Sequence, residues 1–228
     1  MLDWLIGLEA KRRRQLKSAP EGPLRDFLSV PFPDKGRKIC DIPMLSVDFE
    51  TTGLNAKNDK LLSVGFVELL HGQIPLKSCY HQIIRSKGRL SADNVSIHQI
   101  TDSQKDAGES LALVVEELLK ALAGKVMLVH FARIEKQFLS QACLELYGMV
   151  PVFPMIDTLV CEKRLLDMRD VAYDPSELRL ANLRQKYLLP QHFAHNALND
   201  AIATAELLMA HISHLPQGDQ TPLKSLLL

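Results

Sequence analysis

The chain has 228 residues, of which 46% are hydrophobic, and its 27 basic and 27 acidic side chains give a formal net charge of zero. This length fits one domain of ordinary size with a small appendage. A net charge of zero argues against a protein that coats nucleic acid by bulk electrostatics. It does not exclude an enzyme that binds a short stretch of strand with the help of bound cations.

The sequence also bears on the location of the chain. It contains no apolar run long enough to span a membrane, so we expect no membrane partner. Its apolar start precedes the basic run Lys11–Arg14, which is the reverse of the order in a secretory signal. Four widely separated cysteines without a CxxC pair are typical of free thiols in a reducing compartment. We therefore predict a cytoplasmic protein.

Residues 1–43 differ from the rest of the chain. Residues 2–17 predict a short amphipathic helix with a basic end, and residues 19–43 are punctuated by proline and glycine. We interpret the Lys11–Arg14 run as a solvated helix end, with phosphate contact as the alternative. The predicted organisation is an appendage at 1–43, a main domain at 44–215 and a C-terminal tail at 216–228.

The main domain begins with predicted strands. Residues 44–50 form the first, and residues 61–70 and 74–84 flank a His71-Gly72-Gln73 turn that favours an antiparallel pair. A helix at 110–123 and a short strand at 126–129 follow, and further helices are expected at 133–147, 157–166, 180–188 and 197–214. Three antiparallel strands followed by helix-separated strands predict an α/β fold with a central mixed sheet flanked by helices.

The most informative pattern lies in the first strand, within MLSVDFETTGL. Alternation places Asp48 and Glu50 on one face and apolar side chains on the other. Two neighbouring carboxylates at the end of a hydrophobic strand are unfavourable unless a positive charge lies between them, and hard divalent cations prefer oxygen ligands. The turn that follows offers free backbone donors to a substrate. This segment therefore predicts a metal-dependent site that acts on phosphate.

Three other segments carry candidate residues. Glu135 lies in the first turn of a predicted helix, on its core-facing stripe, where it either binds a metal or simply benefits from the helix dipole. In HNALNDA, His195 is able to take a proton near neutral pH and Asp200 to hold a metal. His98, in IHQIT, either meets substrate or packs on a turn.

Taken in order, DFETTGL, the acid in HxxxxExxFL and HxxxxDA resemble the DnaQ-like 3′–5′ exonucleases of the DEDDh type, over about residues 44–215. This family includes the proofreading subunit of bacterial replicative polymerases. The resemblance implies a ribonuclease H-like fold and a hydrolase that releases 5′-mononucleotides from a 3′ end. It also implies that Asp48, Glu50, Glu135 and Asp200 bind two Mg²⁺ or Mn²⁺ ions, with His195 as the general base.

The resemblance further implies how substrate is held. The Thr51-Thr52-Gly53-Leu54 turn and His98 would contact the terminal nucleotide, with Leu54 against its base. The expected partner is the 3′ end of single-stranded or frayed DNA, with RNA as the alternative. A replication-protein partner has only weak support.

Two positions depart from the family pattern, which usually has Asp where this chain has Glu135 and Asn where it has Phe131. Because of them, a rival hypothesis is a catalytically weak module that binds a 3′ end or a protein partner. The tail after Pro216 is expected to be mobile. Its Gln220 and Leu223 slightly resemble peptides that bind a sliding clamp, and the plainer interpretation is an unstructured or self-packed end.

Overall fold

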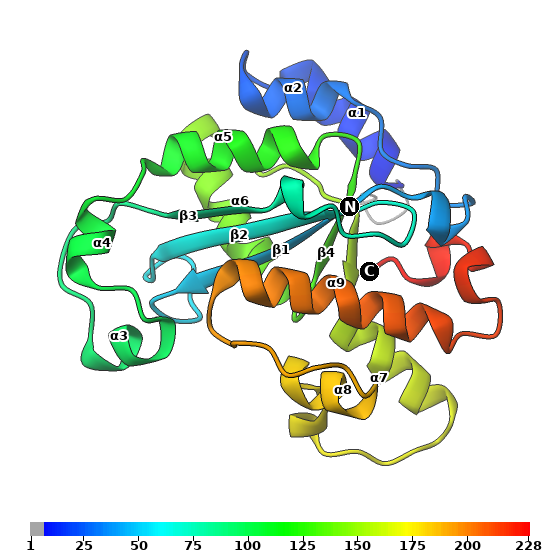
Figure 1. The fold of residues 1–228 in the computed structure, drawn as a ribbon. Helices are drawn as coiled ribbons and strands as arrows, with labels where there is room; N and C mark the ends of the chain where they lie inside the picture. Colours follow the sequence, from blue (N-terminus) through cyan, green and yellow to red (C-terminus); the bar gives the residue numbers. More distant parts are fainter. Residues whose placement is uncertain (1–6) are drawn as a thin grey trace.

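A five-stranded mixed sheet forms the centre of the computed structural model, which describes residues 7–228 (Figure 1). The strand order is β3-β2-β1-β4-β5. Strands β1, β2 and β3 are antiparallel neighbours, whereas β4 and β5 run parallel to β1. The strands are β1 (Met44–Thr51), β2 (Leu61–Leu69), β3 (Tyr80–Ile83), β4 (Val126–Val129) and β5 (Met155–Asp157).

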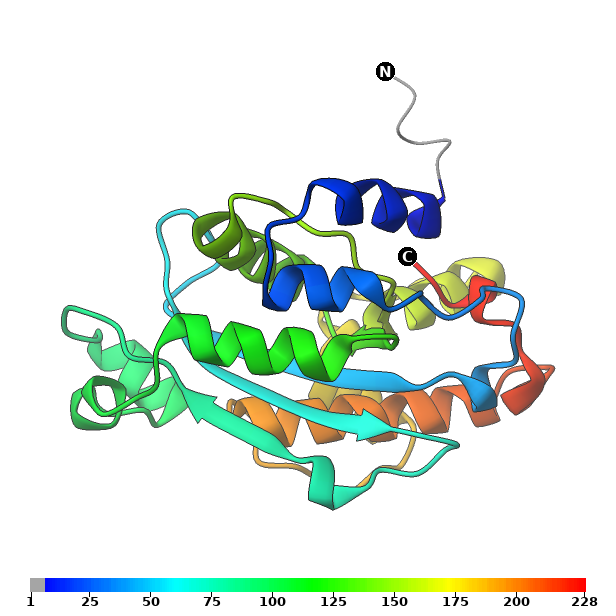
Figure 2. The ribbon, with the colours of Figure 1, turned by 90° about the horizontal axis from the view of Figure 1, so that it is seen from above.

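Helices cover both faces of this sheet (Figures 1 and 2). One face carries α5 (Leu111–Leu122) and α6 (Arg133–Tyr147), and the other carries α9 (Ala197–Ser213), beyond which lie α7 (Thr158–Met168) and α8 (Leu180–Lys186). Two short helices, α3 (Ala92–His98) and α4 (Asp102–Asp106), connect β3 to α5. The predicted α/β fold with a mixed sheet is therefore confirmed. No helix within residues 7–228 combines the length and apolar content that crossing a bilayer requires.

The helix α5 illustrates how the sequence builds these layers. The Ser110 hydroxyl accepts a hydrogen bond from the Leu113 amide and so caps the first turn. Apolar residues then recur at helical spacing, which buries one face of α5 against the sheet. The buried residues are Val114, Val115, Leu118, Leu119 and Leu122.

The segment before β1 packs on the far side of α5. Helix α2 (Pro23–Ser29) contacts α5, and α1 (Leu8–Ser18) packs on α2. Residues 2–6 of the helix predicted at 2–17 lie outside the described residues. The interpretation of the basic run as solvated is wrong for Arg12, which is 4% exposed and donates to Glu9 and to the Leu28 carbonyl. The boundary at residue 43 stays a prediction.

Two further expectations are corrected. The strand predicted at 74–84 begins only at Tyr80, because Pro75 lacks an amide hydrogen and Leu76–Ser78 form a 3₁₀ turn. The tail is not mobile but packed: Leu223 is fully buried, and its amide donates to the Arg37 carbonyl at 2.9 Å. A buried Leu223 also removes the basis for a clamp-binding peptide.

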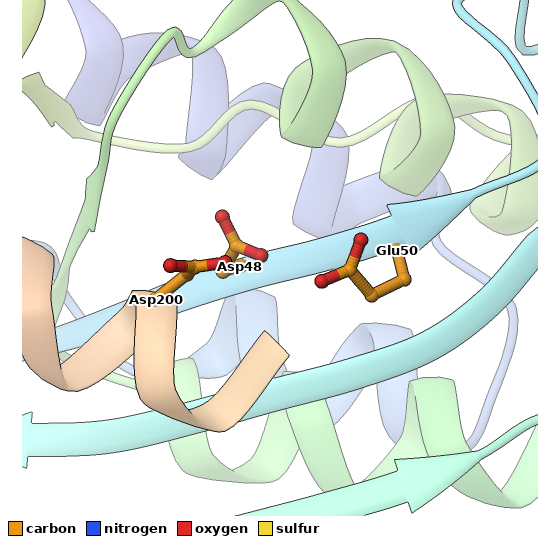
Figure 3. Close-up of side chains that lie close together, drawn as sticks. All are labelled: Asp48, Glu50 and Asp200. Carbon is orange, nitrogen blue, oxygen red and sulfur yellow. The ribbon is translucent and has the colours of Figure 1, made fainter. Parts of the chain in front are cut away.

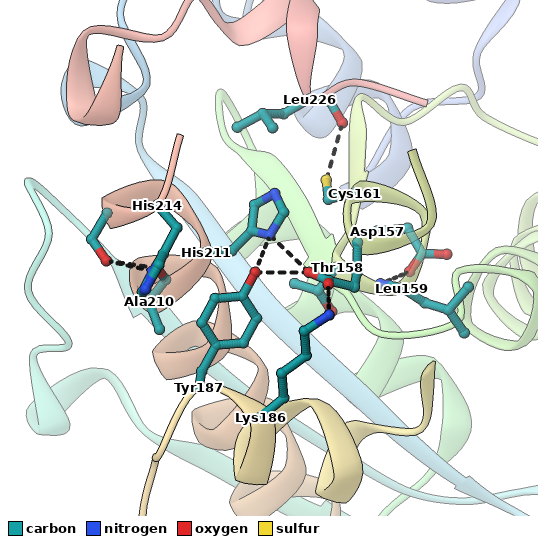
Figure 4. A network of polar contacts seen from close by, with 12 residues as sticks. Asp157, Thr158, Leu159, Cys161, Lys186, Tyr187, Ala210, His211, His214 and Leu226 are labelled. Atoms are coloured by element: carbon teal, nitrogen blue, oxygen red, sulfur yellow. Dashed lines mark hydrogen bonds and ion pairs between the residues drawn. The ribbon is translucent and has the colours of Figure 1, made fainter. Parts of the chain in front are cut away.

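A buried polar network joins α7, α8 and α9 beneath the sheet (Figure 4). The Glu162 carboxylate, 1% exposed, accepts hydrogen bonds from Lys186 at 2.6 Å and from the Tyr187 hydroxyl at 2.7 Å, and His211 lies 3.3 Å away. Burial alone would raise the pKa of Glu162, but the hydrogen bonds from His211, Lys186 and Tyr187 lower it to about 2. The network therefore holds a carboxylate charged inside the helical layer.

Candidate active site

Three carboxylates converge where β1 ends and α9 begins (Figure 3). Asp48 and Glu50 come from β1 and Asp200 from the first turn of α9, and each offers a ligand atom within 4.8 Å of the others. Regular pairing of β1 with β2 ends in a bulge between Glu50 and Thr51, so the strand turns away directly after the second acid. The alternation read from the sequence thus leads both β1 acids to the face that α9 covers.

A glycine allows α9 to reach the sheet at this point. Gly65 in β2 pairs with Asp48, and a Cβ added to Gly65 would lie only 2.2 Å from backbone atoms of Ala197 and Leu198. The Ser46 hydroxyl fixes the same contact by donating to the Ala201 carbonyl at 2.6 Å. This close approach of backbone to backbone delivers Asp200 to the acids of β1.

The fourth predicted acid, Glu135, comes from the opposite layer. It lies in the first turn of α6 and is 2% exposed. Among neighbouring charges, its carboxylate raises the pKa of Asp48 most, although it is not one of the three acids that lie within 4.8 Å of one another. The start of α6 is held by Asp157, whose carboxylate accepts the amides of Phe131 at 3.0 Å and Ala132 at 2.8 Å. Asp157 is a residue that the sequence analysis missed.

Crowding of these carboxylates disfavours their charged forms. Burial first, and then the carboxylates of Glu135 and Asp200, raise the pKa of Asp48 well above its ordinary value. Burial and then the Asp157 carboxylate likewise raise the pKa of Glu135. Burial raises the pKa of Asp200 as well, against the opposing effect of His192. The site is therefore short of positive charge.

The donor set fits a divalent metal ion. Glu50 Oε1 and Glu135 Oε2 are buried and have no hydrogen-bond partner among residues 7–228, which costs free energy unless a cation is bound. All the donors are carboxylate oxygens, the ligands that hard cations such as Mg²⁺ and Mn²⁺ prefer. The residues that would hold such ions are Asp48, Glu50, Asp200 and Glu135.

The two predicted residues of the HNALNDA segment, His195 and Asp200, are in contact, and a third residue, His192, also contacts Asp200. One oxygen of Asp200 accepts the backbone amide of His195 at 2.8 Å, and the other lies 2.8 Å from Nε2 of His192. The His195 backbone has a positive φ of 64°, and its side chain is exposed at the rim of the site. His192 was missed by the sequence analysis, and its only signal was a second histidine three residues before His195.

A cleft of about 550 Å³ opens beside these carboxylates, between α9, the end of α3 and strands β2 and β3. Glu50, His98 and His195 all line it, and the rings of the two histidines are 6.4 Å apart. Nδ1 of His98 lies 2.5 Å from Oε2 of Glu50. His98 therefore lies at the site, and its role, whether a substrate contact or packing on a turn, stays a prediction.

The turn after β1 is stiffened by its own side chains. The Thr51 hydroxyl donates to the Gly53 carbonyl at 2.7 Å, and the Thr52 hydroxyl accepts the Lys60 amide at 2.9 Å. Leu54 projects outward and is 67% exposed. An exposed leucine beside the carboxylate site suits the predicted contact with a base, and the roles of all these residues stay predictions.

Comparison with known proteins agrees with this geometry. Residues 45–208 match the exonuclease family that includes RNase T. DNA polymerase III PolC-type from Thermotoga petrophila is 29% identical over 79% of the chain, and DNA polymerase III subunit epsilon from Treponema pallidum is 26% identical over 76%. The chain spans 12% of that PolC-type polymerase but 78% of the epsilon subunit.

Solved structures share the fold. The nuclease domain of 3′hExo, a DEDDh family member, has a TM-score of 0.62 at 17% identity and covers 83% of this chain and 98% of its own. Escherichia coli exonuclease I has a TM-score of 0.64 at 14% identity, covering 78% of this chain and 42% of its own. The chain thus shares the ribonuclease H-like fold of these nucleases. The chain belongs to the exonuclease family, in agreement with the resemblance to DnaQ-like exonucleases of the DEDDh type that its motifs indicated.

Proposed function

We propose that this exonuclease removes 5′-mononucleotides from the 3′ end of single-stranded or frayed DNA. The observation that carries the proposal is the convergence of Asp48, Glu50 and Asp200, with a buried oxygen of Glu50 that has no partner in the described part of the chain. Such an arrangement suits two Mg²⁺ or Mn²⁺ ions, which would activate water and neutralise charge on the scissile phosphate when bound.

Side chains of the protein take part in proton transfer, in substrate binding and in positioning the carboxylates. His195, at the rim of the cleft, takes the proton of the attacking water, which is the role of a general base. The Thr51–Leu54 turn holds the terminal nucleotide, and Leu54 packs against its base. His192 fixes Asp200 in place through its contact at 2.8 Å.

Digestion of end-labelled DNA tests the proposal. Single-stranded DNA labelled at its 5′ or 3′ end is incubated with Mg²⁺, Mn²⁺ or EDTA, beside an Asp48→Ala control. We expect stepwise loss from the 3′ end that EDTA and Asp48→Ala both abolish. No metal-dependent cleavage of DNA or of a matching RNA would overturn the proposal in favour of a binding module, and faster cleavage of the RNA would reassign the substrate.

The assignment of His195 needs a separate measurement. His195→Ala should lower turnover by roughly 10²–10⁴-fold, the usual contribution of a general base. Metal binding, followed as a rise in melting temperature with added Mn²⁺, should be retained. Turnover at the wild-type level would rule out His195 as the base.

A further inference from the structure

A second cleft lies outside the carboxylate site. Its volume is about 480 Å³, and it runs between the loop after β1 and the outer face of α6. Figure 2 shows this loop beside α6. Three cationic side chains line the cleft, Lys57 on the loop and Arg133 and Lys136 on the helix, and all three residues are exposed.

The charge of this cleft is unbalanced. No acidic residue lines it, and none of its three cations forms an ion pair within residues 7–228. In a chain with no net charge, a cleft with three cations and no acid fits a polyanion.

Two segments that carry acids of the carboxylate site also form the walls of this cleft. Arg133 precedes Glu135 by two residues, so the inner face of α6 carries an acid of the site while its outer face forms the wall of the cleft. Lys57 follows the turn that begins directly after Glu50. From Arg133 to Leu144 the wall is ~16 Å long, which accommodates at most about five nucleotides of a stacked strand.

We propose that this cleft binds the sugar–phosphate backbone of the same single strand whose 3′ end enters the carboxylate site. The proposal rests on the exonuclease function proposed above and adds a place for the nucleotides upstream of the reacting one. Lys57, Arg133 and Lys136 contact phosphates, so the cleft binds strands of any sequence.

The test removes the three charges together. The variant Lys57→Ala/Arg133→Ala/Lys136→Ala is compared with Lys77→Ala/Lys163→Ala/Lys224→Ala, which removes the same charge from exposed positions that line neither cleft. Both are made in an Asp48→Ala background, and binding of a fluorescent 12-nucleotide single strand is measured by anisotropy at several salt concentrations. Three lost phosphate contacts should reduce the salt slope by about 2 and the affinity by about a hundredfold at 0.1 M salt, with the control near the parent protein.

A small substrate separates this proposal from the one on which it rests. Thymidine 5′-p-nitrophenyl phosphate is too short to reach the cleft, so its kcat/KM should be unchanged in the triple variant with Asp48 intact, whereas KM for the oligonucleotide rises. A wild-type protein that cleaves neither substrate refutes the exonuclease function itself. If the wild type is active and the triple variant behaves like the control, the cleft does not bind the substrate strand. If binding weakens only for duplexes with a recessed 3′ end, the cleft binds the complementary strand, and the proposal is again refuted.

Discussion

A methyl group at position 65 would collide with the start of α9. An ideal Cβ on Gly65 lies 2.2 Å from the carbonyl carbon of Ala197 and from the amide nitrogen of Leu198, backbone atoms that are unable to rotate away. Since carbon atoms in contact need ~3.5 Å, the helix or the strand must move by about 1.3 Å. Asp200, in the first turn of the same helix, would move with it.

We therefore expect Gly65→Ala to change both the stability of the fold and the turnover of the enzyme. Without the collision, alanine in a strand would stabilise the fold by roughly 0.5–1 kcal/mol over glycine, but overpacking reverses the sign and costs about 1–3 kcal/mol. A displacement of ~1 Å at a reacting site typically lowers turnover by about 10²-fold. Urea unfolding and nucleotide release from a labelled strand measure the two effects.

The matched control is Gly7→Ala, where an added Cβ meets nothing within 4 Å. This variant should keep full activity and lose little stability. If Gly65→Ala melts and cleaves like the wild type, α9 is not held by its contact with β2, and that contact does not account for the position of Asp200.

Three further changes test other parts of the structure. In EDTA, Asp48→Asn should raise the melting temperature by ~2–4 °C, because it relieves the crowding of buried carboxylates; calorimetry showing a fall would contradict this. Glu162→Gln should lower the free energy of unfolding by on the order of 3 kcal/mol at pH 7, since the depressed pKa of Glu162 stabilises the fold above pH 4.5. That difference should shrink as the pH falls towards about 2, and a pH-independent difference in urea unfolding argues against it. Phe131→Asn should stabilise the fold by ~1 kcal/mol, because asparagine tolerates the φ of 70° at this position better than phenylalanine; an unchanged unfolding midpoint counts against strain there.

The residues predicted from the sequence are those whose signal is local. Alternation in β1 placed Asp48 and Glu50 on one face, and helical periodicity placed Glu135 on the buried side of α6. Both are properties of a few consecutive residues, and the order of the motifs then supplied the family. The local pattern left the roles of Glu135 and His195 open, and the resemblance then suggested a metal ligand and a general base.

What the sequence did not reveal depends on contacts between distant segments. No sequence pattern around Gly65 predicts that α9 packs against it, and none around Asp157 predicts that its carboxylate binds the first amides of α6. The short elements α2, α3, α4 and β5 were missed because three to seven residues carry too little periodicity to identify. The tail was misjudged because its leucines are buried by packing across the molecule.

The packed tail has a consequence for how the protein behaves in concentrated solution. β5 lies at the edge of the sheet, where unpaired main-chain groups would invite strands of other molecules. Ile156 instead bridges to Leu227, and the Leu228 amide donates to the Met155 carbonyl at 3.0 Å. The last residues of the sequence thus shield an edge from intermolecular pairing, so a version shortened after Pro222 would be prone to self-association even with its carboxylate site intact.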